Sequence, residues 1–198
     1  MAYRKTEKVL AQLEAKRALI LACAIDVVGK PGFDGALVEA TAARAGVSVG
    51  LLYKYFPDRT ELFAAVVSSI LARDLAAIRE RAKDEADSLQ ALVGAMVILF
   101  HRFGDSLASR EISAEPTYEK GVRDELARLI AAAVDIAPVD VKLASRAALA
   151  TIGAMAAAHG TMSKRASAAI LFVLRGIGVT EARAQRVIAK GWGLAAAG

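Results

Sequence analysis

Residues 37–63 read LVEATAARAGVSVGLLYKYFPDRTELF, and this stretch decides the fold of the chain. Apolar and small residues recur in its first part at three- and four-residue spacing, which predicts the buried face of a short helix: Leu37, Val38, Thr41, Ala42 and Ala45. Gly46 is expected to end this helix, because glycine adopts the left-handed C-terminal conformation without a Cβ penalty.

A second short helix is expected directly after this turn. Ser48 stands where it would begin, with a hydroxyl that can accept a backbone N–H. Leu52 and Phe56 are four residues apart and would share its inward side. Pro57 and Asp58 then stop it, with Asp58 as the cap of a third helix. Two helices joined by a short turn that contains glycine form a helix-turn-helix, whose second helix enters the major groove of DNA.

The order of residues from 42 to 63 resembles the DNA-binding domain of the tetracycline-repressor (TetR) family of transcriptional regulators. The pattern is A-x-x-A-G-V-S-x-G-x-L-Y-x-Y-F-x-x-x-x-E-L-F. It is carried by Ala42, Ala45, Gly46, Val47, Ser48, Gly50, Leu52, Tyr53, Tyr55, Phe56, Glu61, Leu62 and Phe63. The resemblance implies a homodimeric repressor that binds a palindromic double-stranded DNA operator and is released by a small-molecule effector.

The resemblance also implies which residues meet DNA. The face that reads base edges would consist of Val49, Gly50, Leu51, Tyr53 and Lys54. The positions that meet phosphates would be Ser48, Tyr53, Tyr55 and Arg59. Val49 and Leu51 offer no hydrogen bonds, so Lys54 is the expected polar contact to a base, most simply guanine. A solvated lysine that contacts a phosphate is the equal alternative.

Two positions depart from the family pattern in the first short helix. The family usually has threonine where this chain has Ala36, so the cap is either absent or shifted to Asp34. Thr41 stands where isoleucine is usual, and its hydroxyl can bond back to the carbonyl of Leu37.

Composition agrees with a folded helical protein. The 198 residues are 56% hydrophobic and 24% charged, with a net charge of +5, which predicts a globule compatible with a nucleic-acid partner. No run of alternating residues indicates a sheet, so the fold class is all-α. We expect a helix-turn-helix domain over residues 1–60 and a helical-bundle domain for ligand binding and dimerisation over 61–198.

The sequence gives little support to an enzyme. His101 and His159 lack partners at metal-ligand spacing, so no metal or other cofactor is expected. Cys23 lies among small apolar residues and should be buried. There is no signal peptide, and the longest apolar runs are shorter than the roughly 20 residues that cross a bilayer. We therefore expect a cytoplasmic protein without a membrane partner.

Apolar spacing predicts long helices outside the central stretch, over residues 6–29, 58–83, 88–103, 117–134, 138–159, 163–177 and 180–192. The predicted inward side of the first helix carries Leu10, Leu13, Ile20, Ala24 and Val27. The family resemblance implies that two late helices form the dimer interface, and by position these are 139–159 and 164–177.

The resemblance further implies an effector pocket inside the bundle. Candidate lining residues are Met96, Phe100, Phe103, Tyr118, Met155 and His159, with Arg102 or Glu115 as polar anchors. Such a pocket suits a hydrophobic or aromatic ligand. Apolar residues at helical spacing also fit a plain core. The alternative function is a helical ligand- or partner-binding dimer with weakened sequence-specific DNA recognition, suggested by Ala36 and the apolar reading helix.

Overall fold

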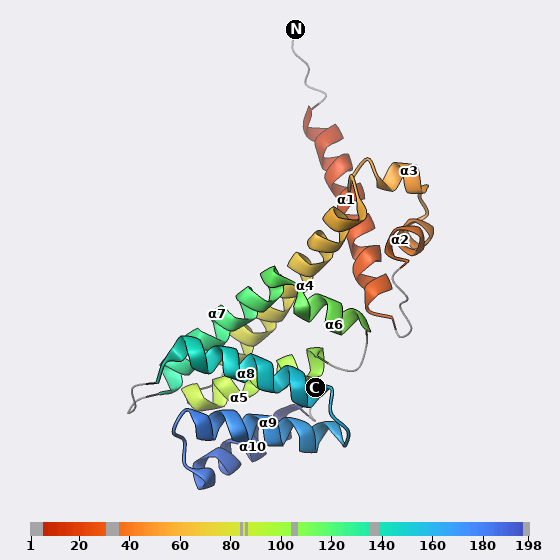
Figure 1. Ribbon diagram of the computed structural model, residues 1–198. Helices are drawn as coiled ribbons and strands as arrows, with labels where there is room; N and C mark the ends of the chain where they lie inside the picture. Colours follow the sequence, from red (N-terminus) through yellow and green to blue (C-terminus); the bar gives the residue numbers. More distant parts are fainter. Residues whose placement is uncertain are drawn as a thin grey trace. The chain divides into compact units, whose positions relative to one another are not determined.

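The structure is a computed structural model that describes residues 6–30, 36–83, 85, 87–103, 107–134 and 139–195. Helices and turns account for these residues without any strand, so the all-α prediction is confirmed (Figure 1). The chain divides into two compact units, the first formed by residues 1–70 with 106–108 and the second by residues 71–105 and 109–198. In the part described, no helix combines the length and apolar character needed to cross a membrane.

The first unit is built from α1 (Thr6–Val28), α2 (Leu37–Ala45), α3 (Val49–Leu52) and the first half of α4 (Arg59–Lys83). α1 packs against α2, and α2 against α3. Its buried side chains include Ile20, Leu37, Leu52, Phe56 and Leu62. Ile20, Leu37, Leu52 and Phe56 are the residues whose spacing predicts an inward side chain, and this prediction is confirmed.

The N-terminal half of α1 differs from its prediction. Ile20, Ala24 and Val27 are buried as expected, whereas Leu10 and Leu13 are 50% and 46% exposed. The inward assignment of these two leucines is wrong. A helix of 23 residues is about 34 Å long, and the nine-residue α2 can cover only part of that length.

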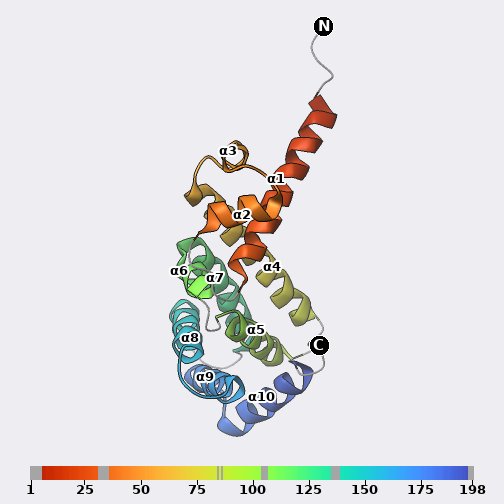
Figure 2. The same cartoon turned by 90° about the vertical axis from the view of Figure 1, so that its right-hand side faces the viewer.

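The second unit contains α5 (Ser88–Arg102), α6 (Leu107–Ala114), α7 (Pro116–Ala133), α8 (Val141–Ala156), α9 (Met162–Gly176) and α10 (Glu181–Ala195). α5 is its central helix, in contact with α7, α8, α9 and α10, and α8 also packs on α7 and α9 (Figure 2). The continuous apolar character of α5 explains this position, because a helix that is hydrophobic on most sides needs neighbours all round.

Capping side chains set several of the helix starts. Asp87 accepts a hydrogen bond from the backbone N–H of Leu89 at 3.0 Å and begins α5, as predicted. Asp140 accepts from Leu143 N–H at 3.0 Å, so α8 begins at Val141 rather than at residue 138. α8 ends at Ala156, three residues before the predicted His159, which is exposed beyond the helix.

A buried carboxylate joins three helices of the second unit. Asp74 of α4 is 2% exposed. Its two oxygens accept hydrogen bonds from Arg102 of α5 at 2.7 and 2.8 Å, and one of them also accepts from the hydroxyl of Tyr118 of α7 at 2.8 Å. Burial, followed by the charge of Asp74, raises the pKa of Tyr118 well above its ordinary value, so the phenol remains a hydrogen-bond donor.

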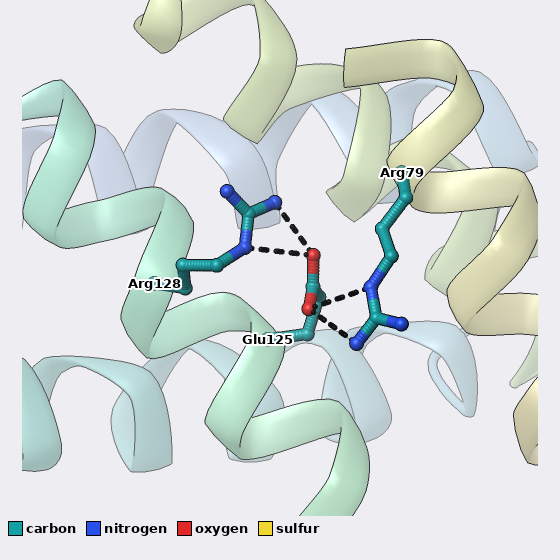
Figure 3. A network of polar contacts seen from close by, with 3 residues as sticks. All are labelled: Arg79, Glu125 and Arg128. Atoms are coloured by element: carbon teal, nitrogen blue, oxygen red, sulfur yellow. Dashed lines mark hydrogen bonds and ion pairs between the residues drawn. The ribbon is translucent and has the colours of Figure 1, made fainter. Parts of the chain in front are cut away.

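A second buried carboxylate links α4 to α7 (Figure 3). Glu125 of α7 lies between Arg79 of α4 and Arg128 of α7, and each guanidinium donates two hydrogen bonds to it, at 2.6–3.2 Å. Burial alone would raise the pKa of Glu125, but the hydrogen bonds from Arg128 and Arg79 outweigh it and hold the pKa below its usual value.

The lowered pKa of Glu125 predicts a pH-dependent contribution to stability. The contribution is fully present above the unfolded-state pKa of about 4.3 and is lost as the pH falls through the lower folded-state pKa. Glu125→Gln should therefore reduce the free energy of unfolding at pH 7 by about 2 kcal/mol, and the difference from the wild type should shrink in acid. Urea denaturation at several pH values measures this.

The matched control is Glu80→Gln, because Glu80 is an exposed glutamate paired with Lys83. An exposed pair contributes about 0–1 kcal/mol, so this variant should unfold almost as the wild type does. Equal losses in the two variants would contradict a special role for Glu125.

Candidate nucleic-acid interface

The turn between α2 and α3 has the geometry that its sequence predicts. Gly46 has φ +63°, in the left-handed region, and the N–H of Val47 returns to the carbonyl of Ala42 at 3.0 Å. Ser48 follows as the cap of α3, since its Oγ accepts from the backbone N–H of Leu51 at 3.1 Å. These local bonds fix the angle between the two helices within three residues.

α3 is shorter than the predicted second helix, and it continues as a turn over residues 53–55. Leu52 and Phe56 are both fully buried and anchor the segment to the core. The carbonyl of Leu52 accepts from the N–H groups of Tyr55 and Phe56 at 2.9 and 3.0 Å. The turn therefore stays wound, and it presents Tyr53 and Lys54 at the surface.

All eight residues predicted to meet DNA lie at least partly at the surface of the first unit. Exposed residues are Ser48, Gly50, Tyr53, Lys54 and Arg59, and half-buried ones are Val49, Leu51 and Tyr55. Within the described part of the chain, neither Lys54 nor Arg59 forms an ion pair with a carboxylate. Two cations therefore stand uncompensated on this surface. Direct contact of these residues with DNA stays a prediction.

The start of α4 carries both a cation and a cap. Asp58 accepts a hydrogen bond from the backbone N–H of Glu61 at 2.7 Å, so the predicted cap is confirmed. Arg59 follows at the first position of the helix. Its guanidinium and the helix N-terminus both favour an anion.

Arg17 is a surface cation whose position the sequence analysis did not single out. Its guanidinium lies over the ring of Phe56, 4.5 Å from the centroid, in a cation–π contact. Helical spacing predicts this position, because Arg17 precedes the buried Ile20 and Ala24 by three and seven residues and so lies on the same face of α1.

The two departures from the family pattern have different outcomes. α2 begins after Ala36 without a side-chain hydrogen bond to its first turn, and Asp34 lies outside the described residues. Thr41 is fully buried, and its Oγ1 has no hydrogen-bond partner in the described structure. The predicted bond from Thr41 to the carbonyl of Leu37 is therefore wrong. An unpaired buried hydroxyl costs about 1–3 kcal/mol, which makes this position a weak point of the small domain.

Comparison with known proteins identifies the region that contains this surface. Residues 20–66 match the family model described as bacterial regulatory proteins, tetR family. Over these residues the chain is similar to the tetR family of bacterial regulatory proteins. The match covers the buried half of α1, both short helices and the start of α4.

Similarity to curated transcriptional regulators extends over less than half of the chain. The transcriptional regulator RutR of Escherichia coli K12 is 36% identical over 85 residues, which are 43% of this chain and 40% of RutR. The transcriptional repressor KstR of Rhodococcus jostii RHA1 is 36% identical over 69 residues, 35% of this chain and 31% of KstR. The transcriptional activator FasR of Mycolicibacterium smegmatis is 29% identical over 87 residues, 44% and 40% of the two chains. The matches thus span about a third to two fifths of these relatives.

Solved tetR-type structures share the fold along most of the chain. RolR in complex with resorcinol superposes with a TM-score of 0.65 at 19% identity, over 90% of this chain and 95% of RolR. CprB from S. coelicolor A3(2) gives 0.61 at 19% identity, over 91% and 98%. At these identities the likeness establishes the fold alone. It confirms the prediction of an N-terminal helix-turn-helix joined to a C-terminal helical region.

The two glycines of this segment make a matched pair for testing the turn. Gly46→Ala should lower the free energy of unfolding by about 1 kcal/mol or more, because alanine is strained at positive φ. Gly50→Ala should leave stability unchanged or raise it by about 0.5 kcal/mol, because an added Cβ meets nothing within 4 Å and the backbone is helical. Urea denaturation compares them, and a loss in Gly50→Ala equal to that in Gly46→Ala would contradict this account.

Proposed function

We propose that this chain is a ligand-responsive transcriptional repressor that binds a palindromic operator as a homodimer and is released by a small hydrophobic or aromatic effector. It works in the cytoplasm. Its partners are double-stranded DNA, the effector and a second copy of the chain. The DNA contacts are made by Ser48, Val49, Gly50, Leu51, Tyr53, Lys54, Tyr55 and Arg59.

The DNA-binding part of the proposal rests on one observation. The capped turn holds α3 on the core through Leu52 and Phe56, and it leaves Lys54 and Arg59 exposed, with no carboxylate partner among the described residues. Cations fixed beside a short exposed helix suit a duplex, where phosphate contacts position the protein and base contacts specify the sequence. Lys54 would read a base, and Arg59 would hold a phosphate.

Repression is the proposed sign of regulation because it requires only occupancy of the operator. KstR is a transcriptional repressor and FasR a transcriptional activator, so both signs occur among the similar proteins. Activation would need an additional surface for the transcription machinery. Occupancy needs only the DNA contacts and the dimer.

The homodimer is supported by an apolar surface on α8 and α9. Leu143 is 64% exposed and Phe172 is 66% exposed. They border a depression of about 350 Å³ that is lined mainly by small and apolar residues, including Ala147 and Val173. Large exposed apolar side chains grouped in this way mark protein interfaces. A two-fold axis through this surface would pair each helix with its symmetry mate and would match a palindromic operator.

The effector-binding residues stay a prediction, and they differ in how a ligand would reach them. Met96, Phe100 and Tyr118 are fully buried, so a ligand would contact them only after local opening. Phe103 and Met155 are half-buried, and His159 is exposed. Of the proposed polar anchors, Arg102 is engaged with Asp74, and Glu115 precedes α7 at its N-cap position. RolR was solved with resorcinol, and a ligand of one aromatic ring is our proposal here too.

The alternative is a ligand- or partner-binding helical dimer with weakened sequence-specific DNA recognition. It is favoured by the presence of alanine at the N-cap position of α2 and by the hydroxyl of Thr41, which is unpaired in the described structure. Selection of bound sequences from random duplex DNA at several salt concentrations separates the two functions. Enrichment of one palindrome supports the regulator. Weak, salt-sensitive binding without sequence preference supports the alternative.

Two single substitutions test the DNA contacts. Arg59→Ala should weaken binding to all duplexes and reduce the slope of log K against log salt by about 1, because one phosphate contact is lost. Lys54→Ala should change the preference among operator variants by about 1–3 kcal/mol at one base pair. Lys190→Ala, which removes an exposed cation of α10, should change neither. If Arg59→Ala leaves the salt slope unaltered, Arg59 does not contact a phosphate. If Lys54→Ala leaves the preference among operator variants unaltered, Lys54 does not read a base.

A charged substitution within the apolar patch tests the proposed dimer surface. Phe172→Asp should convert the dimer to a monomer in sedimentation equilibrium, because association would bury an unpaired carboxylate. Leu10→Asp is the control, since Leu10 is also half exposed but lies on α1. A dimer that persists in Phe172→Asp, or dissociates equally in both variants, places the interface elsewhere.

A further inference from the structure

A small cleft in the second unit opens beside the C-terminal end of α5. It has a volume of about 260 Å³, and its walls come from α6, α7 and α8 as well as from the residue that follows α5. The lining residues are Phe103, Ser113, Glu119, Arg146, Leu149 and Ala150.

One side of the cleft is apolar. Leu149 is 7% exposed and forms part of the packed core. The half-buried ring of Phe103 makes an edge-to-face contact with Tyr118, with centroids 6.4 Å apart and planes at 70°. A Cβ added at Gly153 would lie 3.9 Å from Phe103, so the backbone of α8 passes close to this ring at Gly153. The volume of the cleft and its apolar side together suit a ligand with one aromatic ring.

The charged groups of the cleft are not equivalent. Glu119 accepts a hydrogen bond from Nη1 of Arg123 at 2.7 Å, so its charge is compensated within α7. Arg146 is exposed on α8, and the described residues supply no carboxylate to it. The cleft therefore combines an apolar side with one unopposed guanidinium, which binds carboxylates through two parallel hydrogen bonds.

We propose that this cleft binds a small aromatic carboxylate as the effector, with the carboxylate on Arg146 and the ring against Phe103 and Leu149. The inference rests on the proposed ligand-responsive function and specifies the chemistry of its effector. A carboxylate is favoured over a neutral ring because only the charged group adds a charge-assisted, bidentate pair with Arg146.

The position of Arg146 also connects the cleft to the dimer surface. Arg146 and Leu143 are three residues apart on α8, and Leu143 borders the apolar patch proposed for dimerisation. A ligand held by Arg146 and Phe103 would draw α8 toward the end of α5. Because α8 is a rigid helix, this movement would also shift the apolar patch. Ligand contacts that differ between two positions of α8 are what coupling between the cleft and the dimer surface requires.

Isothermal titration calorimetry on the full chain tests the cleft directly, with benzoate as the probe and benzamide and inorganic phosphate as comparisons. Benzoate should bind saturably to one site per chain. Arg146→Gln should weaken it at least tenfold, while Arg186→Gln, an exposed arginine of α10 outside the cleft, should leave it unchanged. Ala150→Trp, at an exposed lining position, should block the site by filling it.

Several results would overturn the proposal. They are benzoate binding that survives Arg146→Gln and Ala150→Trp, benzamide or phosphate binding as tight as benzoate, and no benzoate binding at all. The DNA selection experiment separates this inference from the proposed function. A chain that selects a palindrome but fails to bind benzoate overturns only the inference. A chain that binds benzoate through Arg146 without selecting DNA retains the cleft and loses the regulator.

Discussion

The carboxylate of Asp74 is the constraint on which the second unit depends. A charge in a helical interior must be paired and hydrogen-bonded, and here Asp74 pairs with Arg102 and accepts three hydrogen bonds from Arg102 and Tyr118. Because the donors belong to α5 and α7 and the acceptor to α4, these three helices can pack together only in the arrangement that brings the groups together. The apolar contacts of α5 supply most of the driving force for burial, and the Asp74 cluster selects one arrangement among those that bury similar area.

The structure of the first unit depends on local helix-end interactions and not on a buried polar network. The unit is small, α2 and α3 are short, and their geometry is set by local features: a left-handed glycine, a serine cap and an aspartate cap within thirteen residues. These devices fix the direction of α3 without a large core. The two uncompensated cations then occupy positions that backbone geometry determines, as recognition of a rigid duplex requires. A polar interior network specifies the packing of the second unit, while helix caps specify the shape of the first.

Much of this arrangement could be read from the sequence, because helix ends are local. Gly46, Ser48, Asp58 and Asp87 act where their chemistry predicts. The predictions fail where a contact with residues distant in the sequence determines the structure. Apolar spacing continues through Leu10 and Leu13, but spacing does not reveal how far a neighbouring helix extends. The start of α8 was placed at Pro138 rather than at the cap Asp140, because both are helix-start residues and only the hydrogen bond to Leu143 distinguishes them. The cleft of Phe103 and Arg146 joins residues 43 positions apart, which no local pattern connects.

The clamp on Glu125 has a consequence for how α4 can move within the second unit. Two guanidinium groups grip one carboxylate from opposite sides, each through paired hydrogen bonds with strict directionality. Sliding α4 by a fraction of a turn would separate Arg79 from the carboxylate without offering it another acceptor. The hydrogen bonds therefore oppose even a small slide of α4 along α7. Within the second unit, the Arg79 end of α4 is held in register with α7, so a displacement of α4 would have to break these bonds or carry α7 with it.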